Sequence, residues 1–164
     1  MRIIGGKVSS LGLLSPFNSQ EVTLETTELE IRLRARAFRE AIIKAGQGVL
    51  LTLDNFPAGS CGDASILLAT YLEELGYGRF DYVCGSRNGH SHAWLAKDGL
   101  IVDITADQFP EIKEMVFVGN EHHWHGEFCE DPERYKVRIN DYDSHTRTSL
   151  TQTYHNNRNL VKVD

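Results

Sequence analysis

Apolar positions in the first third of the chain recur with a helical period. They are spaced mostly three and four residues apart, and the series is Leu29, Leu33, Ala37, Phe38, Ala41, Ile42 and Ala45. Thr27 and Glu30 have the spacing of a capping box, and Gly46 is a natural helix stop. The pattern predicts an amphipathic helix over residues 27–48. Residues 1–26 are rich in Ser, Gly and Thr and predict an irregular arm before it.

The same predicted helix carries charges of both signs. Its arginines lie near Glu28, Glu30 and Glu40, and they are Arg32, Arg34, Arg36 and Arg39. Mixed charges along a helix are typical of a solvated face, which is the interpretation we favour. A docking face for an acidic partner is the alternative.

A second apolar-periodic segment predicts a helix from Cys61 to Leu75, which Gly76 ends. Beyond it the period becomes that of β-strands. Four short runs predict strands, at residues 80–84, 92–96, 100–104 and 115–118. Asp98-Gly99, between the second and third runs, predicts a tight hairpin turn.

Helices followed by a meander of strands predict an α+β fold, with the Cys61 helix packed on an antiparallel sheet. The 164 residues suffice for one domain with its own hydrophobic core. We expect residues 56–140 to form the core that carries the chemistry. Residues 141–164 are polar, with few apolar positions, and predict a tail or a late edge strand.

Charge and composition narrow the classes of function. The net charge of −6 argues against a general nucleic-acid binder, which would carry a basic face. The chain has no apolar run near the ~20 residues of a membrane span, and its N-terminal segment does not predict a signal peptide. Cys61, Cys84 and Cys129 cannot all pair, which favours free thiols in a reducing compartment. We therefore expect a cytoplasmic protein, or one delivered from the cytoplasm as an effector, with no membrane partner.

Three residues follow one another along the chain in the order expected for a Cys-His-Asp nucleophilic triad. Cys61 stands at a predicted helix start, where unpaired N–H groups favour the thiolate. His92 lies within one predicted strand and Asp103 within the next. The Asp103 carboxylate interrupts an apolar run and therefore needs a polar partner. In such a triad the thiol attacks, the imidazole takes its proton and the carboxylate orients the imidazole.

Each triad assignment has an alternative. His90 is a rival to His92, because both point to one face of the strand if that strand begins early. We favour His92 since it lies inside the apolar run, on the same face as Trp94. For Cys61 the alternative is a small buried residue at a helix start, and for Asp103 an outward-facing strand residue.

The sequence around the triad resembles a known family. Gly59-Ser60-Cys61-Gly62-Asp63, His92-Ala93-Trp94 and Asp103-Ile104-Thr105 are similar to the motifs of the transglutaminase-like, papain-fold cysteine enzymes, and the resemblance covers residues 56–109. It implies a papain-like core with Cys61 as nucleophile, His92 as general base and acid, and Asp103 as orienting carboxylate. The family includes proteases, amidases, transamidases, deamidases and inactive relatives. The resemblance therefore predicts the attack of the thiol on an amide better than it predicts the final product.

Further polar residues are candidates for the rim of the site. Asn55, upstream of Cys61, is a candidate donor to an oxyanion. Gln108 and Asp107 follow the third predicted strand, where they are able to reach the cleft. Trp124 is a candidate aromatic wall for the substrate, and Trp94 is a further candidate for the rim.

A histidine-rich segment offers a different chemistry. Its potential metal ligands are His122, His123, His125 and Cys129, to which His90 and His92 add further nitrogen atoms. The spacing matches no closed zinc set, so we expect neither a metal nor another cofactor. The alternatives for the segment are an exposed loop and a rim of the active site.

Together these features predict a cysteine-dependent amide hydrolase, a peptidase or an amidase, that acts on a protein or peptide through a thioester at Cys61. Hydrolysis is favoured because a small stand-alone domain needs only water as its second substrate. Glutamine-directed transamidation or deamidation on the same triad is the first alternative. A non-enzymatic or zinc-binding module on the same scaffold is the second.

Overall fold

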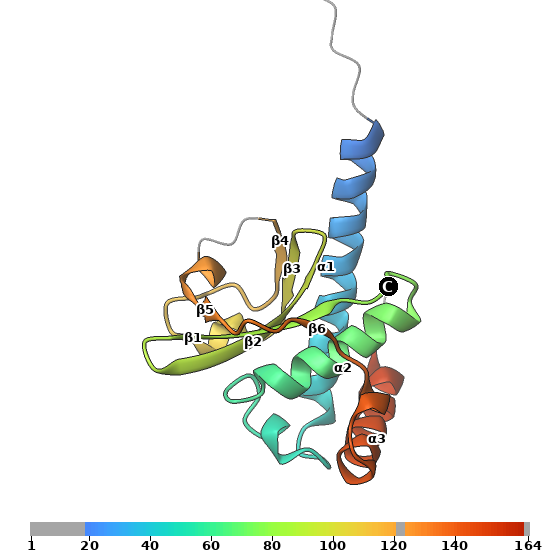
Figure 1. The fold of residues 1–164 in the computed structure, drawn as a ribbon. Helices are drawn as coiled ribbons and strands as arrows, with labels where there is room; N and C mark the ends of the chain where they lie inside the picture. The colour runs from blue at the N-terminus through green and yellow to red at the C-terminus, as the bar shows by residue number, and fades with distance from the viewer. Residues whose placement is uncertain (1–18, 121–123, 163–164) are drawn as a thin grey trace, which may run out of the picture.

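The chain folds into α-helices and one antiparallel sheet, so the α+β prediction is confirmed (Figure 1). The structure is a computed structural model that describes residues 19–120 and 124–162. The helices in those residues are α1 (Ser19–Ala45), α2 (Cys61–Glu74) and α3 (Ser144–Leu160). The strands are β1 (Asp81–Arg87), β2 (His90–Lys97), β3 (Leu100–Asp103), β4 (Phe117–Gly119), β5 (Cys129–Glu130) and β6 (Tyr135–Lys136).

The strands follow the order β4-β3-β2-β1-β5 across the sheet, and β6 also pairs with β1. β2 and β3 are joined by the predicted turn, where Asp98 and Gly99 both have a positive φ, of 50° and 86°. That backbone is the one a two-residue type I′ hairpin requires. Within the described ranges, none of the helices has the length and apolarity needed to cross a membrane.

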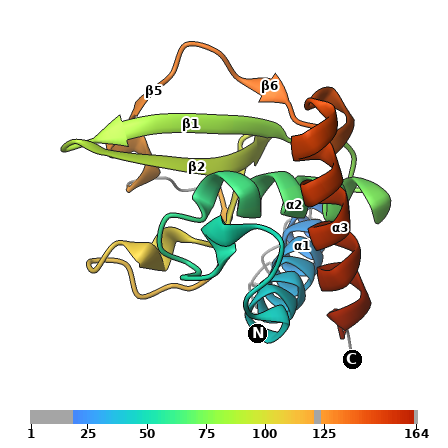
Figure 2. The same cartoon turned by 90° about the horizontal axis from the view of Figure 1, so that it is seen from below.

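The two faces of the sheet carry different cores. Aliphatic side chains such as Leu95 and Val102 pack against the three helices in one large cluster. An aromatic cluster around Trp94 covers the other face. Figure 2 shows α2 running beside the β1–β2 hairpin, with α1 and α3 at one end of the sheet. Because side chains alternate along a strand, His92 points to the aromatic face together with Trp94.

α1 is longer than predicted. It begins at Ser19, so Thr27 lies inside the helix and the predicted N-cap is wrong. The residues before Thr27 include the strong helix formers Gln, Glu and Leu, which continue the helix toward the N-terminus. The helix ends at Ala45, and Gly46 follows in the left-handed region with φ of 64°. Residues 1–18 of the predicted arm lie outside the described residues.

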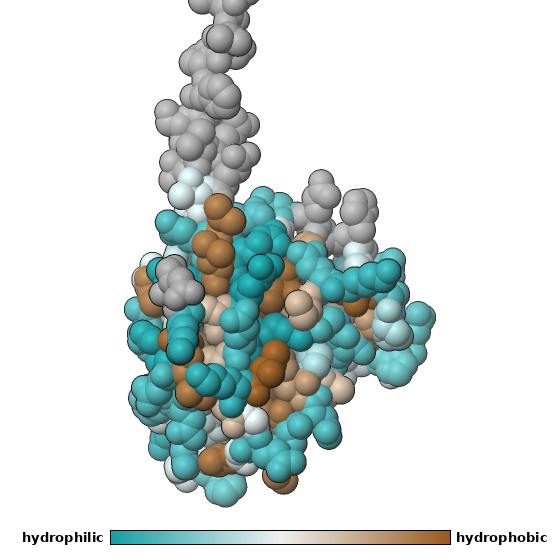
Figure 3. All heavy atoms as spheres, turned by 180° about the vertical axis from the view of Figure 1, so that it is seen from behind, coloured by the Kyte–Doolittle hydropathy of each residue, from teal (hydrophilic) through white to brown (hydrophobic). Residues whose placement is uncertain are grey.

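The predicted apolar stripe of α1 is buried at Ala37, Phe38, Ala41 and Ile42, but its first two residues are exposed. Leu29 and Leu33 are 57 % and 52 % exposed. On the face of the molecule in Figure 3, hydrophobic patches lie among hydrophilic surface. The residues that line the core are Ile31, Ala35, Phe38 and Ile42. A step of four residues advances by about 400°, so a row of such steps drifts around the helix. Alternating steps of four and three stay on one face.

Arg39 corrects the prediction of a wholly solvated charged face on α1. It is 5 % exposed and forms two hydrogen bonds to the Asp107 carboxylate, at 2.9 Å and 2.7 Å. Its guanidinium also donates to the Ile104 carbonyl and lies 4.9 Å from the centre of the Phe56 ring. A buried bidentate pair of this kind fixes geometry, and this one ties the segment after β3 to α1.

The last segment is a helix, so the prediction of a tail or an edge strand over 141–164 is wrong. Asp143 caps α3 by accepting from the backbone N–H groups of His145 and Thr146, at 3.0 Å and 3.2 Å. The buried positions have ideal helical spacing, but half are polar: Leu150, Thr153, Tyr154 and Asn157. An analysis of apolar periodicity does not detect such a helix, because its buried face is not marked by apolar residues alone.

Candidate functional site

Cys61 is the first residue of α2, and the turn before it leaves the thiol partly buried at the helix N-terminus. Ser60 precedes it, and its hydroxyl donates to the Thr52 carbonyl at 2.7 Å instead of capping the helix. The first N–H groups of α2 therefore remain free of a side-chain cap. Position 62 favours glycine for a steric reason, because a Cβ there would lie 3.2 Å from the Tyr82 hydroxyl.

His92 and Asp103 lie on neighbouring strands and point to the same face of the sheet. β2 and β3 pair with Leu95 opposite Val102, which places His92 diagonally across from Asp103. The two side chains meet with His92 Nε2 at 2.7 Å from Asp103 Oδ2. Both are almost completely buried, at 0 % and 1 % exposure. The prediction placed Trp94 on this face, and its ring lies 5.6 Å from that of His92.

An aromatic box holds the His92 ring. The ring centres around it lie 5.2 Å to 5.6 Å away and belong to Trp94, Phe109, Trp124 and Phe128. Arg87 lies over the outside of this box, 5.2 Å from the centre of the Trp124 ring, and binds Glu111 and Glu127. The box restrains the imidazole and excludes bulk water from it, since His92 is 0 % exposed.

Asp103 accepts hydrogen bonds at both oxygen atoms. Oδ1 accepts from the backbone N–H and the hydroxyl of Thr105, at 2.8 Å and 3.1 Å. Oδ2 accepts from His92 and also from His125 Nε2, at 3.0 Å. Burial alone would raise the pKa of this carboxyl group, but the hydrogen bonds and charges of His125 and His92 hold it well below its usual range. Asp103 is therefore a fixed negative charge.

His125 is the site residue that the sequence analysis assigned to another role. It is 3 % exposed and stands in a short 3₁₀ turn over His125–Glu127, with its ring 4.9 Å from Trp124 and 5.1 Å from Trp94. The prediction grouped it with potential metal ligands, with an exposed loop or with a rim of the active site. The available signal was its sequence neighbour Trp124, a large aromatic side chain that packs on the same cluster.

The pKa values of the thiol and the imidazole shift in opposite directions. Burial would raise the pKa of Cys61, but the hydrogen bond and charge of His92, with the backbone N–H groups of Ala93 and Gly62, lower it below its ordinary value. Burial would lower the pKa of His92, but Asp103 and Cys61 raise it to about 9. These shifts favour a thiolate–imidazolium pair next to a carboxylate.

Gln108 joins the imidazole to the turn before α2. Its Nε2 lies 3.0 Å from His92 Nδ1 and donates to the Thr105 carbonyl at 3.1 Å. Its Oε1 accepts from the Gly59 N–H at 3.4 Å. Because His92 Nε2 donates to the carboxylate, Nδ1 is the nitrogen that remains for the thiol and for the Gln108 amide.

The other predicted rim residues lie in different surroundings. His90 is exposed, and within the described residues no hydrogen bond joins it to Asp103, which His92 contacts instead. Asn55 is exposed in the turn before α2, and among the same residues no hydrogen bond joins its side chain to the thiol. Asp107 pairs with Arg39 and is turned away from the cleft. Trp124 forms one wall of the His92 box, and its indole N–H donates to Glu111 at 3.3 Å.

One group of side chains has the composition of a metal site. His92, Asp103 and His125 each offer a ligand atom, and these atoms lie within 4.8 Å of one another. Tetrahedral zinc with bonds of about 2.0–2.1 Å separates neighbouring ligand atoms by about 3.3 Å. The N···O distances of 2.7 Å and 3.0 Å are instead those of charge-assisted hydrogen bonds. Cys129 is exposed on β5 and is not part of this group.

His122 and His123 lie outside the described residues, so the structure does not bear on their part in the predicted cluster. An open pocket of about 680 Å³ begins beside Gln108. It is lined by the tip of the β1–β2 hairpin, including Arg87 and His90, and by Phe109 and Glu111. Gln108 links this pocket to the triad, since its Nε2 lies 3.0 Å from His92 Nδ1. Comparisons with known protein families, with curated proteins and with solved structures found no match.

Proposed function

We propose that the protein is a cysteine-dependent amide hydrolase that acts on a protein or peptide through the triad Cys61, His92 and Asp103. The observation that carries the proposal is the buried hydrogen bond between His92 and Asp103, at 2.7 Å, beside a thiol whose pKa the imidazole lowers. The opposite pKa shifts of Cys61 and His92 support it further. A helix that begins at the cysteine and neighbouring strands that carry the other two residues are consistent with a papain-like, transglutaminase-like core.

The chemistry begins with attack of the Cys61 thiolate sulfur on the carbonyl carbon of the amide. The tetrahedral intermediate collapses as its C–N bond breaks, and the leaving amine takes the proton of the His92 imidazolium. A thioester then links the acyl group to Cys61. Water attacks this thioester while His92 accepts one of its protons, and the C–S bond breaks to release the carboxylic acid and restore the pair.

The oxyanion of each intermediate requires donors near the sulfur. The backbone N–H of Cys61 is one, since it is among the free groups at the start of α2. The Gln108 amide is the second. Its N–H faces Nδ1 of neutral His92, and protonation of Nδ1 turns that nitrogen into a donor. The N–H of Gln108 is then free to bind the oxyanion, so formation of the ion pair prepares the site.

Asp103 and His125 act as positioning residues in this scheme. Asp103 fixes the tautomer of His92 by accepting from Nε2, which leaves Nδ1 toward the thiol. His125 shares the same carboxylate oxygen at 3.0 Å and holds it in place from the other side. A carboxylate with both oxygen atoms bonded cannot rotate away from the imidazole, which supports a preorganised base.

Hydrolysis is favoured over transamidation because of the pocket beside Gln108. Its lining includes Arg87, His90 and Glu111, whose charged and polar groups favour water over the alkyl chain of an acceptor amine. A transamidase needs an acceptor amine to approach the thioester while water is kept out. Deamidation of glutamine uses the same steps with ammonia as the leaving group, and it remains the closest alternative within this proposal.

The test is activity profiling with a peptide amide library, followed by mass spectrometry of the products. We expect cleavage or deamidation of some amide that depends on Cys61, with turnover that falls above pH about 9, where His92 loses the proton that the leaving amine needs. Limiting iodoacetamide should label Cys61 before Cys84, since burial and Asp131 raise the pKa of Cys84. In His92→Gln the Cys61 thiolate should form at a higher pH.

Two results would redirect the proposal. Cys61-dependent incorporation of a labelled primary amine into a glutamine-rich protein would make the enzyme a transamidase. If Cys61 is inert in the folded protein while another thiol labels, the nucleophile is wrong.

A zinc-binding module is the second candidate, and the grouping of His92, Asp103 and His125 is the observation that favours it. Zinc there would displace the protons that hold the triad together and would abolish the base. One tightly bound zinc ion per chain, with unfolding on chelation, is what this candidate requires. Protein whose melting and Cys61 labelling are unchanged by EDTA would exclude it.

A further inference from the structure

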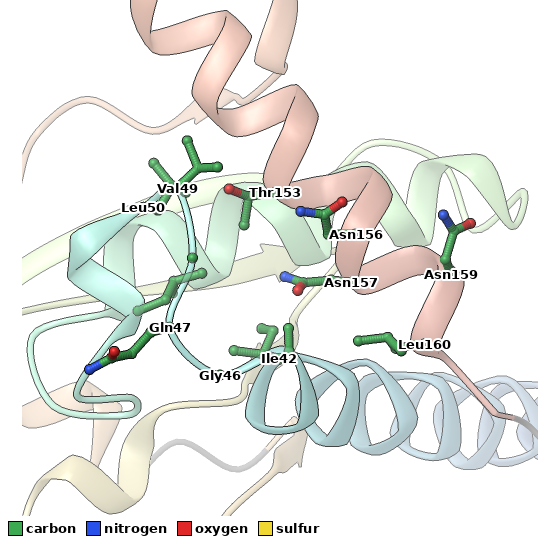
Figure 4. Close-up of a pocket in the computed structure, with 13 residues that line it drawn as sticks. Ile42, Gly46, Gln47, Val49, Leu50, Thr153, Asn156, Asn157, Asn159 and Leu160 are labelled. Carbon is green, nitrogen blue, oxygen red and sulfur yellow. The ribbon is translucent and has the colours of Figure 1, made fainter.

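A second pocket lies away from the triad, where the ends of two helices meet. It has a volume of about 370 Å³ and is enclosed by the end of α1, the loop over residues 46–50 and the second half of α3 (Figure 4). None of its lining residues belongs to the triad, and among the described residues no hydrogen bond joins this lining to the triad. The pocket therefore needs an explanation of its own.

Two buried polar side chains point into this pocket without a partner. Thr153 is 6 % exposed and Asn157 is 1 % exposed, and both project from α3 toward the space in Figure 4. Within the described residues, neither Thr153 Oγ1 nor Asn157 Nδ2 forms a hydrogen bond. Buried polar groups in proteins are nearly always satisfied, so these two atoms indicate a polar occupant.

The remaining walls define what that occupant can be. Apolar side chains form one side, and they are Ile42, Val49, Leu50, Leu53 and Leu160. Of the described residues that line the space, none has an ionisable side chain. α1 ends at Ala45 and α3 ends at Leu160, and the last carbonyl groups of a helix carry a partial negative charge. An anion is therefore disfavoured, whereas a neutral group with N–H donors is favoured.

We propose that this pocket binds an uncharged amide that carries a branched apolar group. The carbonyl oxygen of the ligand accepts from Asn157 Nδ2 and from the Thr153 hydroxyl. Its N–H groups donate toward the carbonyl groups at the two helix ends. The apolar group packs on the wall that Ile42 and Leu53 form. A capped leucine residue of a peptide has this chemistry and fits the volume.

The proposal does not depend on the triad, and it is tested on the full chain by ¹⁵N-edited NMR. The probe is N-acetyl-leucine amide, which is expected to bind saturably with a Kd of about 1–10 mM, typical for a ligand of this size. The shifts should centre on Thr153 and Asn157. N-acetyl-leucine, which replaces the terminal amide with a carboxylate, should bind at least tenfold more weakly.

Three variants sharpen the assignment. Asn157→Leu and Thr153→Val remove the unpaired groups and should weaken probe binding at least fivefold, with circular dichroism confirming the fold of each. Two variants are used so that misfolding of one leaves the other decisive. Asn159→Ala is the matched control, because Asn159 lines the rim but points away from the space in Figure 4, and its affinity should match that of the unchanged protein.

Each of three outcomes would overturn the proposal. The first is the absence of saturable binding of the neutral probe up to tens of millimolar. The second is equal affinity for the carboxylate probe, which would contradict the role of the helix ends. The third is unchanged affinity in folded Asn157→Leu and Thr153→Val, which would place the probe elsewhere.

Discussion

Two regions of this protein bury polar side chains, and these side chains are hydrogen-bonded in one region but partly unpaired in the other. Around Asp103 the buried groups are paired, with four donors on one carboxylate. At the junction of α1 and α3, Thr153 and Asn157 are buried to a similar degree but each has an unpaired atom. The first arrangement is rigid without a ligand. The second reaches full hydrogen bonding only with an occupant.

This difference predicts which substitutions should lower the stability of the folded protein. Removing one member of a paired network leaves its partners buried and unsatisfied, which costs more than the lost hydrogen bond. Removing an unpaired group takes away a cost that the folded protein already carries. Function and stability should therefore respond together at Asp103, the centre of the paired network, and they should separate at the second pocket.

The largest effect is expected for Cys61→Ala, which should lower turnover by at least ~10⁴-fold because the nucleophile is gone. The fold should remain, since a small residue replaces a small one and the helix start keeps its backbone. Assays of kcat/KM with circular dichroism measure both. Cys84→Ala is the matched control and should stay active. Loss of activity in Cys84→Ala with Cys61→Ala still active would reverse the roles of the two thiols.

Asp103→Asn should lower kcat/KM by about 10²- to 10⁴-fold while leaving residual turnover, because the base remains but its tautomer is disturbed. The amide N–H groups of this variant would also face groups that donate hydrogen bonds to the carboxylate in the unchanged protein. Two donors cannot pair, so the melting temperature should fall. A variant with unchanged kcat/KM would remove Asp103 from the triad. This substitution breaks the fully paired region at its centre.

His125→Phe should destabilise the protein by about 1.5–3 kcal/mol at neutral pH, since the aromatic packing is kept but a hydrogen bond to a charged group is lost. The pKa of Asp103 is lowered in the folded state, so its stabilisation is present above the unfolded value and disappears as pH falls through the folded value. The difference in melting temperature between the two proteins should therefore narrow from pH 6 toward pH 2. A difference that is constant with pH would make His125 a packing residue only.

Asn157→Leu should have the smallest effect, and with the opposite sign. Replacing an unpaired buried amide by an apolar group of similar size should raise stability by up to about 1 kcal/mol, or about 2–4 °C in melting temperature. Thermal unfolding without any probe measures this. A loss of more than 1 kcal/mol would mean that Asn157 has a structural partner, such as a bound water, and the contrast between the two regions would disappear.

The sequence by itself determined the elements whose signals are local. The helix that begins at Cys61 and the Asp98-Gly99 hairpin follow from residues within a few positions of one another, and both are observed. The same turn sets the pairing of β2 with β3. That register brings His92 to Asp103, because the alternation of side chains fixes which residues share a face. The candidate triad was therefore accessible from the chain alone.

Only the tertiary structure decided the features that depend on distant surfaces. α3 carries two polar residues on its buried face, so its burial against α1 has no apolar signature in the sequence. His125 reaches Asp103 across 22 positions of chain, through a segment whose path the aromatic cluster determines. Arg39 is buried because Asp107 meets it from another element. Periodicity records only the average polarity of a face, whereas pairing between remote polar groups depends on how the elements pack.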